Sequence, residues 1–215
     1  MNRKMIGYYN YTVILTYLGM VSACIAIFLA IGNNLWLSLW FMMIAGLCDM
    51  FDGTVASTKK DRDENQKSFG IQIDSLCDLV GFGVAPGVFV YTVSKNNIIG
   101  GIVAVFITLA AVIRLAYFNV LEANRQKQES GHRKSYLGVP VTTIVLVLPI
   151  IYVLLQICNV DADAVQYFYQ IAVTLIGIGF ITPVYIKKPQ RTGKIAIVAI
   201  GLLEAVAMIL VRKAV

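Results

Sequence analysis

Four aspartates lie in two closely spaced pairs in the first half of the chain. Asp49 and Asp52 are three residues apart, and Asp74 and Asp78 are four apart, so on a helix each pair shares one face. Apolar sequence flanks both pairs, and charged groups in a membrane are costly unless something neutralises them. Hard divalent cations prefer carboxylate oxygens as ligands. The spacing therefore predicts a divalent-cation site formed by two neighbouring helices.

Small residues accompany these aspartates. Gly53 directly follows Asp52, Ala56 lies three residues later, and Gly70 precedes Asp74 by four residues. Positions with little or no side chain let a ligand or a second backbone approach closely. Such a pocket suits a diphosphate, because a metal ion there can stabilise the charge that leaves with one phosphate. A carboxylate that is not a metal ligand can act as general base on an acceptor hydroxyl.

The composition indicates whether these residues lie in a water-soluble domain or in a membrane. The chain has 215 residues, of which 58% are hydrophobic and 14% are charged, and its mean hydropathy is +0.74. A soluble domain has about a quarter charged residues. We therefore expect an all-α, polytopic membrane helix bundle that forms a single domain over residues 1–215. Its catalytic core is predicted at about residues 10–150 and its C-terminal helices at about 164–213.

Seven spans are predicted, six in the core and one more at the C-terminus. They cover about residues 11–31, 35–52, 69–93, 98–120, 137–157, 165–186 and 195–211, each close to the ~20 residues that a crossing requires. No segment shows the alternation of a strand. Gly81, Gly83, Pro86 and Gly87 predict close packing and a bend in the third span.

The basic residues predict the orientation. The formal charge of +6 lies in short clusters between apolar runs, which favours a lipid bilayer and not a nucleic acid as partner. Lys and Arg gather at the N-terminus and in the loops at 59–67, 125–134 and 187–194, whereas the opposite loops hold only Lys95. The positive-inside rule then places the aspartates on the cytoplasmic side. A multi-pass protein of a bacterial or archaeal cell membrane is expected, and a homodimer is left open.

The motif also resembles a known signature. Asp49-x2-Asp52-Gly53-x2-Ala56, followed by Gly70-x3-Asp74-x3-Asp78, is similar to that of the CDP-alcohol phosphatidyltransferases. Members are membrane enzymes that move a phosphatidyl group from a CDP-linked lipid to an alcohol and release CMP, with Mg²⁺ or Mn²⁺. The resemblance implies two divalent ions held by Asp49, Asp52 and Asp74, with Asp78 as a shared ligand or as the general base. Gly53, Ala56 and Gly70 would line the cytidine-diphosphate site.

Two features depart from the signature. Ser57 stands where the family has arginine, and twelve residues, not about eight, separate it from Gly70. Either Lys59, Lys60 or Arg62 supplies the missing phosphate-directed cation, or activity is reduced. The expected CDP-lipid-binding residues are Asp52, Gly53, Ala56, Ser57, Lys59, Lys60 and Gly70.

Further segments resemble one branch of this family, the membrane-embedded phosphatidylserine synthases. They are residues 69–78, 82–86, 114–119 and 136–140. This resemblance implies CDP-diacylglycerol and L-serine as substrates. Because serine carries a carboxylate, a cation is expected near it; the candidate acceptor-binding residues are Arg114, Asn119, Arg125, Arg133 and Lys134. The alternatives are another acceptor, such as glycerol phosphate, an inositol phosphate or a different amino alcohol, and, outside the enzymes, a divalent-cation carrier.

Overall fold

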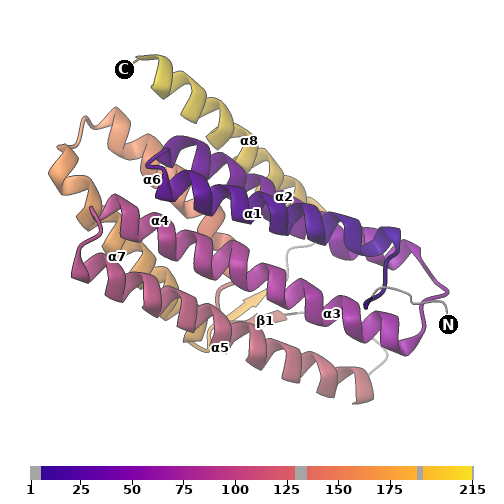
Figure 1. Cartoon of the computed structure of the whole chain (residues 1–215). Helices are drawn as coiled ribbons and strands as arrows, with labels where there is room; N and C mark the ends of the chain where they lie inside the picture. The colour runs from indigo at the N-terminus through magenta and orange to yellow at the C-terminus, as the bar shows by residue number, and fades with distance from the viewer. Residues whose placement is uncertain (1–5, 129–134, 188–190, 215) are drawn as a thin grey trace.

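The computed structural model describes residues 6–128, 135–187 and 191–214, and it is a helical bundle (Figure 1). In chain order its elements are η1 (Tyr11–Val13), α1 (Ile14–Ile31), α2 (Leu35–Thr58), α3 (Glu64–Leu79), η2 (Val80–Val84), α4 (Ala85–Val93), α5 (Ile98–Gln128), β1 (Ser135–Leu137), η3 (Val141–Thr143), α6 (Ile144–Ile157), α7 (Ala162–Ile181), β2 (Tyr185–Lys187) and α8 (Arg191–Ala214). The predicted all-α membrane architecture is confirmed, apart from one short pair of strands.

Within the described part of the chain, six helical segments are long and apolar enough to cross a membrane. They are Tyr11–Ile31, Leu35–Thr58, Glu64–Val93, Ile98–Ala123, Ala162–Ile181 and Ile195–Arg212. The remaining predicted span is the shorter apolar helix Val141–Ile157. It begins four residues later than expected because Gly138 has a φ of +81° and Pro140 follows in extended backbone, so neither continues a helix.

The third span contains one widened helical turn. Val80–Val84 is π-helical and lies between α3 and α4, just before Pro86 in the first turn of α4. Proline has no amide hydrogen to donate to the preceding turn, so the helix loses its regular ladder there. The sequence predicted a bend in this span, and the structure has a π-helical turn just before Pro86. The span also starts at Glu64, five residues earlier than expected.

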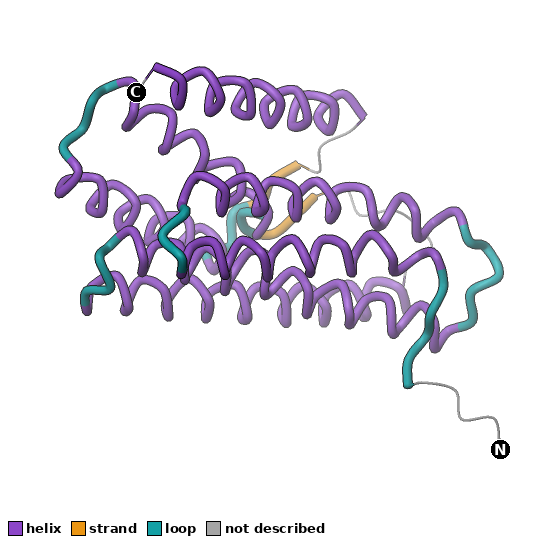
Figure 2. The backbone as a smooth tube through the Cα atoms, turned by 45° about the horizontal axis from the view of Figure 1, so that its top comes forward, coloured by secondary structure: helices purple, strands orange, loops and turns teal. Residues whose placement is uncertain are grey.

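The two strands form an antiparallel ribbon that the sequence did not predict. Ser135 pairs with Lys187, Tyr136 with Ile186 and Leu137 with Tyr185. The ribbon lies beside the helices in Figure 2, where it is orange. The predicted fifth span included Leu137 and the predicted sixth span included Tyr185 and Ile186, so both were wrong at those ends. The sixth span stops at Ile181 because Pro183 cannot extend α7.

The helices bury a continuous core and leave an apolar exterior. α1 packs along α2, α5 packs against α4 and α7, and α6 packs against α8. Phe82, Phe89 and Ile107 are fully buried, whereas Phe28 and Leu203 are each 70% exposed. Large apolar side chains on the outside are expected where lipid, and not water, surrounds the bundle.

Polar contacts at one end of the bundle fix the positions of two connections there. Lys95, in the turn between α4 and α5, forms an ion pair with Asp163 at the start of α7. Nearby, the Asn97 amide donates to Gln166 Oε1 at 3.0 Å. Residues 59–63 form the charged loop between α2 and α3. This loop and the turn that contains Lys95 lie at different ends of the bundle.

Candidate active site

Two helices bring three of the four aspartates together. Asp49 belongs to α2, and Asp74 and Asp78 belong to α3. Each offers one carboxylate oxygen, and these three oxygens lie within 4.8 Å of one another. The four-residue spacing places Asp74 and Asp78 on one face of α3, opposite the face of α2 that carries Asp49. We call this group of three the carboxylate cluster.

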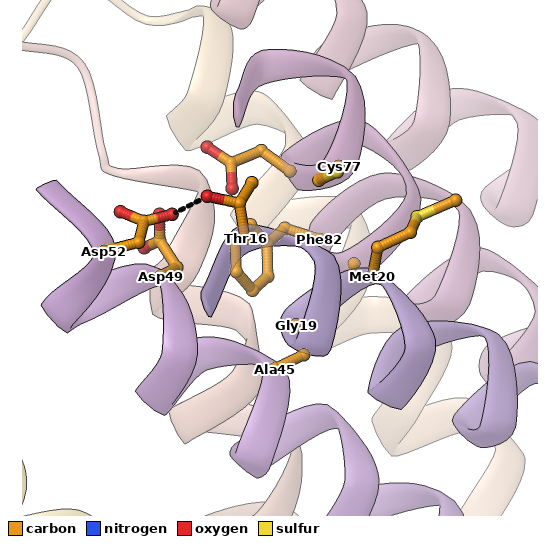
Figure 3. A pocket seen from close by; sticks show the side chains of 10 residues that line it. Thr16, Gly19, Met20, Ala45, Asp49, Asp52, Cys77 and Phe82 are labelled. Atoms are coloured by element: carbon orange, nitrogen blue, oxygen red, sulfur yellow. Dashed lines mark hydrogen bonds between the residues drawn. The ribbon is translucent and has the colours of Figure 1, made fainter. Parts of the chain in front are cut away.

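Asp52, the fourth aspartate, also belongs to α2, and its side chain is hydrogen-bonded by α1. Its side chain is only 7% exposed, and its Oδ2 accepts a hydrogen bond of 3.0 Å from Thr16 Oγ1 of α1. Figure 3 shows Asp49 and Asp52 projecting from α2, with this bond marked. Asp52 is not one of the three carboxylates that lie within 4.8 Å of one another, but it lines the same pocket and contacts Asp74. Sequence reasoning did not identify Thr16.

The aspartates border a pocket between α1, α2 and the third span. The pocket is shallow, and its empty space of about 240 Å³ includes open solvent at its mouth. Asp49, Asp52, Asp78 and Thr16 line its polar part, and the other lining residues are apolar or small, namely Gly19, Met20, Ala45, Cys77, Gly81 and Phe82. Figure 3 shows Met20 and Phe82 at this pocket. The pocket therefore combines hard oxygen ligands with an apolar wall. Three converging carboxylates are a suitable donor set for a hard divalent cation such as Mg²⁺.

The polar residues at the end of α2 and in the charged loop after it have different surroundings. Ser57 is exposed, and its hydroxyl donates to the Thr54 carbonyl at 2.7 Å. Lys59 Nζ donates to Asp61 at 3.0 Å, and this hydrogen bond lowers the pKa of Asp61. Lys60 is exposed. Arg62 is half-buried and lies over α3. The loop thus presents one cation to α3 and the others to solvent or to Asp61.

The two glycines of the motif have different surroundings. A Cβ added at Gly53 would meet nothing within 4 Å, so the α2 surface after Asp52 is open. A Cβ at Gly70 would lie 3.8 Å from Arg62 Nη1. Ala56, between them in the sequence, is half-buried. Open space beside Gly53 is compatible with a ligand, and Gly70 is covered by the loop.

Some of the predicted acceptor-binding residues lie outside the part of the chain that the structure describes. Arg114 of α5 is 8% exposed, and its Nη1 would be 2.5 Å from a Cβ at Gly138. Asn119, also on α5, donates to Ser75 Oγ at 2.8 Å, next to Asp74 in α3. Arg125 lies near the end of α5, and Arg133 and Lys134 lie outside the described residues. The structure therefore brings Asn119 to the α3 helix and Arg114 to the turn before α6.

The chain is similar to several characterised proteins. It is 38% identical over 116 residues to the CDP-diacylglycerol–serine O-phosphatidyltransferase of Saccharomyces cerevisiae, covering 52% of this chain and 40% of that protein. It is 31% identical over 140 residues to the archaetidylserine synthase of Methanothermobacter thermautotrophicus, covering 65% and 56%. It is 32% identical over 142 residues to the CDP-diacylglycerol–serine O-phosphatidyltransferase of Helicobacter pylori, covering 65% and 54%.

These matches cover about half the length of the curated relatives. The sequence profile of the CDP-alcohol phosphatidyltransferases matches residues 9–184, a range that includes all four aspartates and the helices that carry them. Both the profile and the arrangement of the aspartates agree with the resemblance seen in the sequence. The chain belongs to the CDP-alcohol phosphatidyltransferase family.

Proposed function

We propose that this protein transfers a phosphatidyl group from CDP-diacylglycerol to the hydroxyl of L-serine, forming phosphatidylserine and CMP. The proposal is based on the carboxylate cluster, whose three oxygens lie within 4.8 Å of one another. Family membership indicates the reaction class. The names of the yeast and Helicobacter relatives specify serine, and that of the archaeal relative specifies a serine lipid. These names agree on serine and differ in the lipid, so serine is the better supported part.

Each aspartate has a role in the proposed reaction. Asp49 and Asp74 would hold Mg²⁺ or Mn²⁺, and Asp52, held in place by Thr16, would contribute to a second ion. Asp78 lies beside them and would serve mainly as the general base. When bound, such ions supply positive charge that stabilises a diphosphate as its leaving phosphate becomes more negative. The donor set of carboxylate oxygens suits these hard cations and not a soft metal.

The chemical step is a single displacement. The serine hydroxyl oxygen attacks the phosphorus that carries the lipid, and Asp78 accepts the hydroxyl proton. The bond between that phosphorus and the bridging oxygen breaks, and CMP leaves with the electron pair. No covalent bond to the protein forms. Because the pocket has an apolar wall at Met20 and Phe82, the lipid chains can remain among the helices while the diphosphate reaches the aspartates.

The acceptor is tested by measuring CMP release. Purified protein in lipid micelles is supplied with CDP-diacylglycerol, Mn²⁺ or Mg²⁺, and one alcohol at a time: serine, glycerol phosphate, inositol phosphate or ethanolamine. We expect CMP only with serine, and none after EDTA removes the metal. CMP release with only a different alcohol would identify that alcohol, and not serine, as the acceptor. No release with any alcohol, together with Mn²⁺ uptake into protein-containing vesicles, would favour a cation carrier.

The role of Asp78 is tested by Asp78→Asn. A missing general base typically costs about 10²- to 10⁴-fold in turnover, so we expect a loss of CMP release of this size while CDP-diacylglycerol still binds. Asp161→Asn is the matched control, because Asp161 is an exposed carboxylate just before α7 whose side chain makes no cap hydrogen bond, and it should leave turnover unchanged. Loss of CDP-diacylglycerol binding in step with turnover would make Asp78 chiefly a metal ligand.

A further inference from the structure

One cation of the α2–α3 loop lies on the face of α3 that carries the aspartates. Gly70, Asp74 and Asp78 are spaced by four residues and so line one face of the helix. Arg62 Nη1 lies 3.8 Å from the position of a Cβ on Gly70. At 1.5 Å of rise per residue, Gly70 is about 6 Å along α3 from Asp74. The Arg62 guanidinium therefore lies about one turn from the carboxylate cluster, on its loop side.

The polar groups at this place lack partners. Arg62 Nε and Gln66 Oε1 are buried and have no hydrogen-bond partner among the described residues. A buried donor without an acceptor is unfavourable, and such groups are rare in folded proteins. Gln66 is four residues before Gly70 and so lies on the same face of α3. An anion next to Gly70 would supply the acceptor that Arg62 Nε lacks.

The other polar residues of the loop are less suited to this task. Lys59 is 3.0 Å from Asp61 and is neutralised by it. Lys60 is exposed, and the Ser57 hydroxyl is used by the Thr54 carbonyl. Arginine also differs from lysine in its planar fork of donors, which binds two phosphate oxygens at once. The contacts thus select Arg62 from the three cations that the sequence left open.

We propose that Arg62 binds the phosphate that leaves with CMP. This inference rests on the proposed function, since it names a residue that holds the same substrate. A polar nucleotide would lie on the loop side of the cluster, whereas the lipid chains would remain in the bilayer beside the apolar wall of the pocket. The phosphate nearer the nucleotide is then the one within reach of Arg62. The longer link after Ser57 provides the length that folds Arg62 back over Gly70.

The test is the affinity for CMP in the presence of Mn²⁺, measured by calorimetry on the full chain in detergent. We expect Arg62→Gln to weaken CMP binding by about tenfold, because it removes a charge-assisted hydrogen bond, and Arg62→Lys to weaken it less. The matched control Lys67→Gln, at an exposed lysine of α3, should stay within about twofold of the unmodified protein. Adding S57R to Arg62→Gln should restore affinity, since it returns a cation to the end of α2.

Two results would separate this inference from the proposed function. An Arg62→Gln protein that binds CMP as tightly as the unmodified protein, or a Lys67→Gln protein that is weakened equally, overturns the role of Arg62 alone. An unmodified protein that binds no CMP contradicts the proposed function itself. Thermal unfolding of each variant confirms that the comparison is between folded proteins, and Arg62→Lys retains the charge if Arg62→Gln does not fold.

Discussion

At the scale of single residues, the site depends on a contact between α1 and α2. Thr16 donates to Asp52, and both side chains are less than 9% exposed. A buried carboxylate is tolerated when hydrogen bonds or cations compensate for the water it has lost. The same carboxylate contacts Asp74 of α3, so the bond from Thr16 restrains Asp52 beside the carboxylate cluster. Thr16 is thus a positioning residue for a carboxylate that we propose binds metal.

Thr16→Val should weaken metal binding without unfolding the protein. Removing the partner that orients a ligand typically costs about tenfold or more in metal affinity, so the Mn²⁺ concentration for half-maximal CMP release should rise about tenfold. Thr92→Val is the control, because the Thr92 hydroxyl donates to the Val88 carbonyl of its own helix, at the far end of the bundle. An unchanged Mn²⁺ requirement in Thr16→Val would show that Asp52 does not need this bond.

The residue-scale features differ in how far the sequence predicted them. The aspartates were predictable because helical spacing alone places Asp74 and Asp78 on one face. Thr16 was not, because a threonine in an apolar run carries no signal until α1 packs on α2. The choice of Arg62 over Lys59 also required the structure. Both are basic residues of one loop, and only the folded loop shows that one pairs with Asp61 and the other covers Gly70.

At the scale of helices, glycines set how closely the third span approaches α5. A Cβ on Gly87 would lie 3.0 Å from the Ala104 carbonyl oxygen, and one on Gly83 would lie 3.0 Å from the Ala111 Cβ. Such distances are shorter than side chains normally allow, and a backbone atom cannot swing away as a long side chain can. Small residues at helix contacts permit this close packing in membranes. The position of α3, and hence of its aspartates, depends on it.

Gly87→Ala should therefore destabilise the bundle. Forcing one extra methyl group against the α5 backbone typically costs about 1–3 kcal/mol, which should lower the thermal unfolding midpoint in detergent. Gly201→Ala of α8 is the control, because its nearest neighbour would be Leu146 Cδ2 at 3.9 Å, an ordinary contact. It should leave the midpoint unchanged or raise it slightly, since alanine favours a helix. Equal midpoints in the two variants would argue against close α4–α5 packing as a source of stability.

Among the elements, the helices were predictable and the ribbon was not. Long uncharged runs identify spans because a membrane crossing requires them. β1 and β2 pair residues about fifty positions apart, Leu137 with Tyr185 at one end, and each strand is only three residues long. No local alternation can appear over three residues. Their apolar residues were consequently assigned to the neighbouring helices, and the fifth span was predicted too long.

At the scale of the whole molecule, the orientation in the membrane follows from the two ends of the bundle. The α2–α3 loop lies on the side of the aspartates, and Cys158 caps α6 at the opposite end, near the turn that contains Lys95. Counted from the sequence, basic residues are concentrated on the first side. The positive-inside rule therefore predicts that serine and CMP are exchanged with the cytoplasm, and that Cys158 faces the outside of the cell.

A membrane-impermeant maleimide tests this orientation. Among the cysteines, Cys158 is exposed, whereas Cys24, Cys48 and Cys77 are partly buried in helices. In intact bacteria that express the protein, Cys158 should be labelled from outside. A Lys60→Cys variant with Cys158→Ser should be labelled only after the cells are permeabilised, because position 60 is exposed on the loop beside the aspartates. The Cys158→Ser protein alone controls for labelling of the buried thiols. Labelling of Lys60→Cys in intact cells would place the aspartates on the outer side, where they could not meet a cytoplasmic nucleotide-linked lipid.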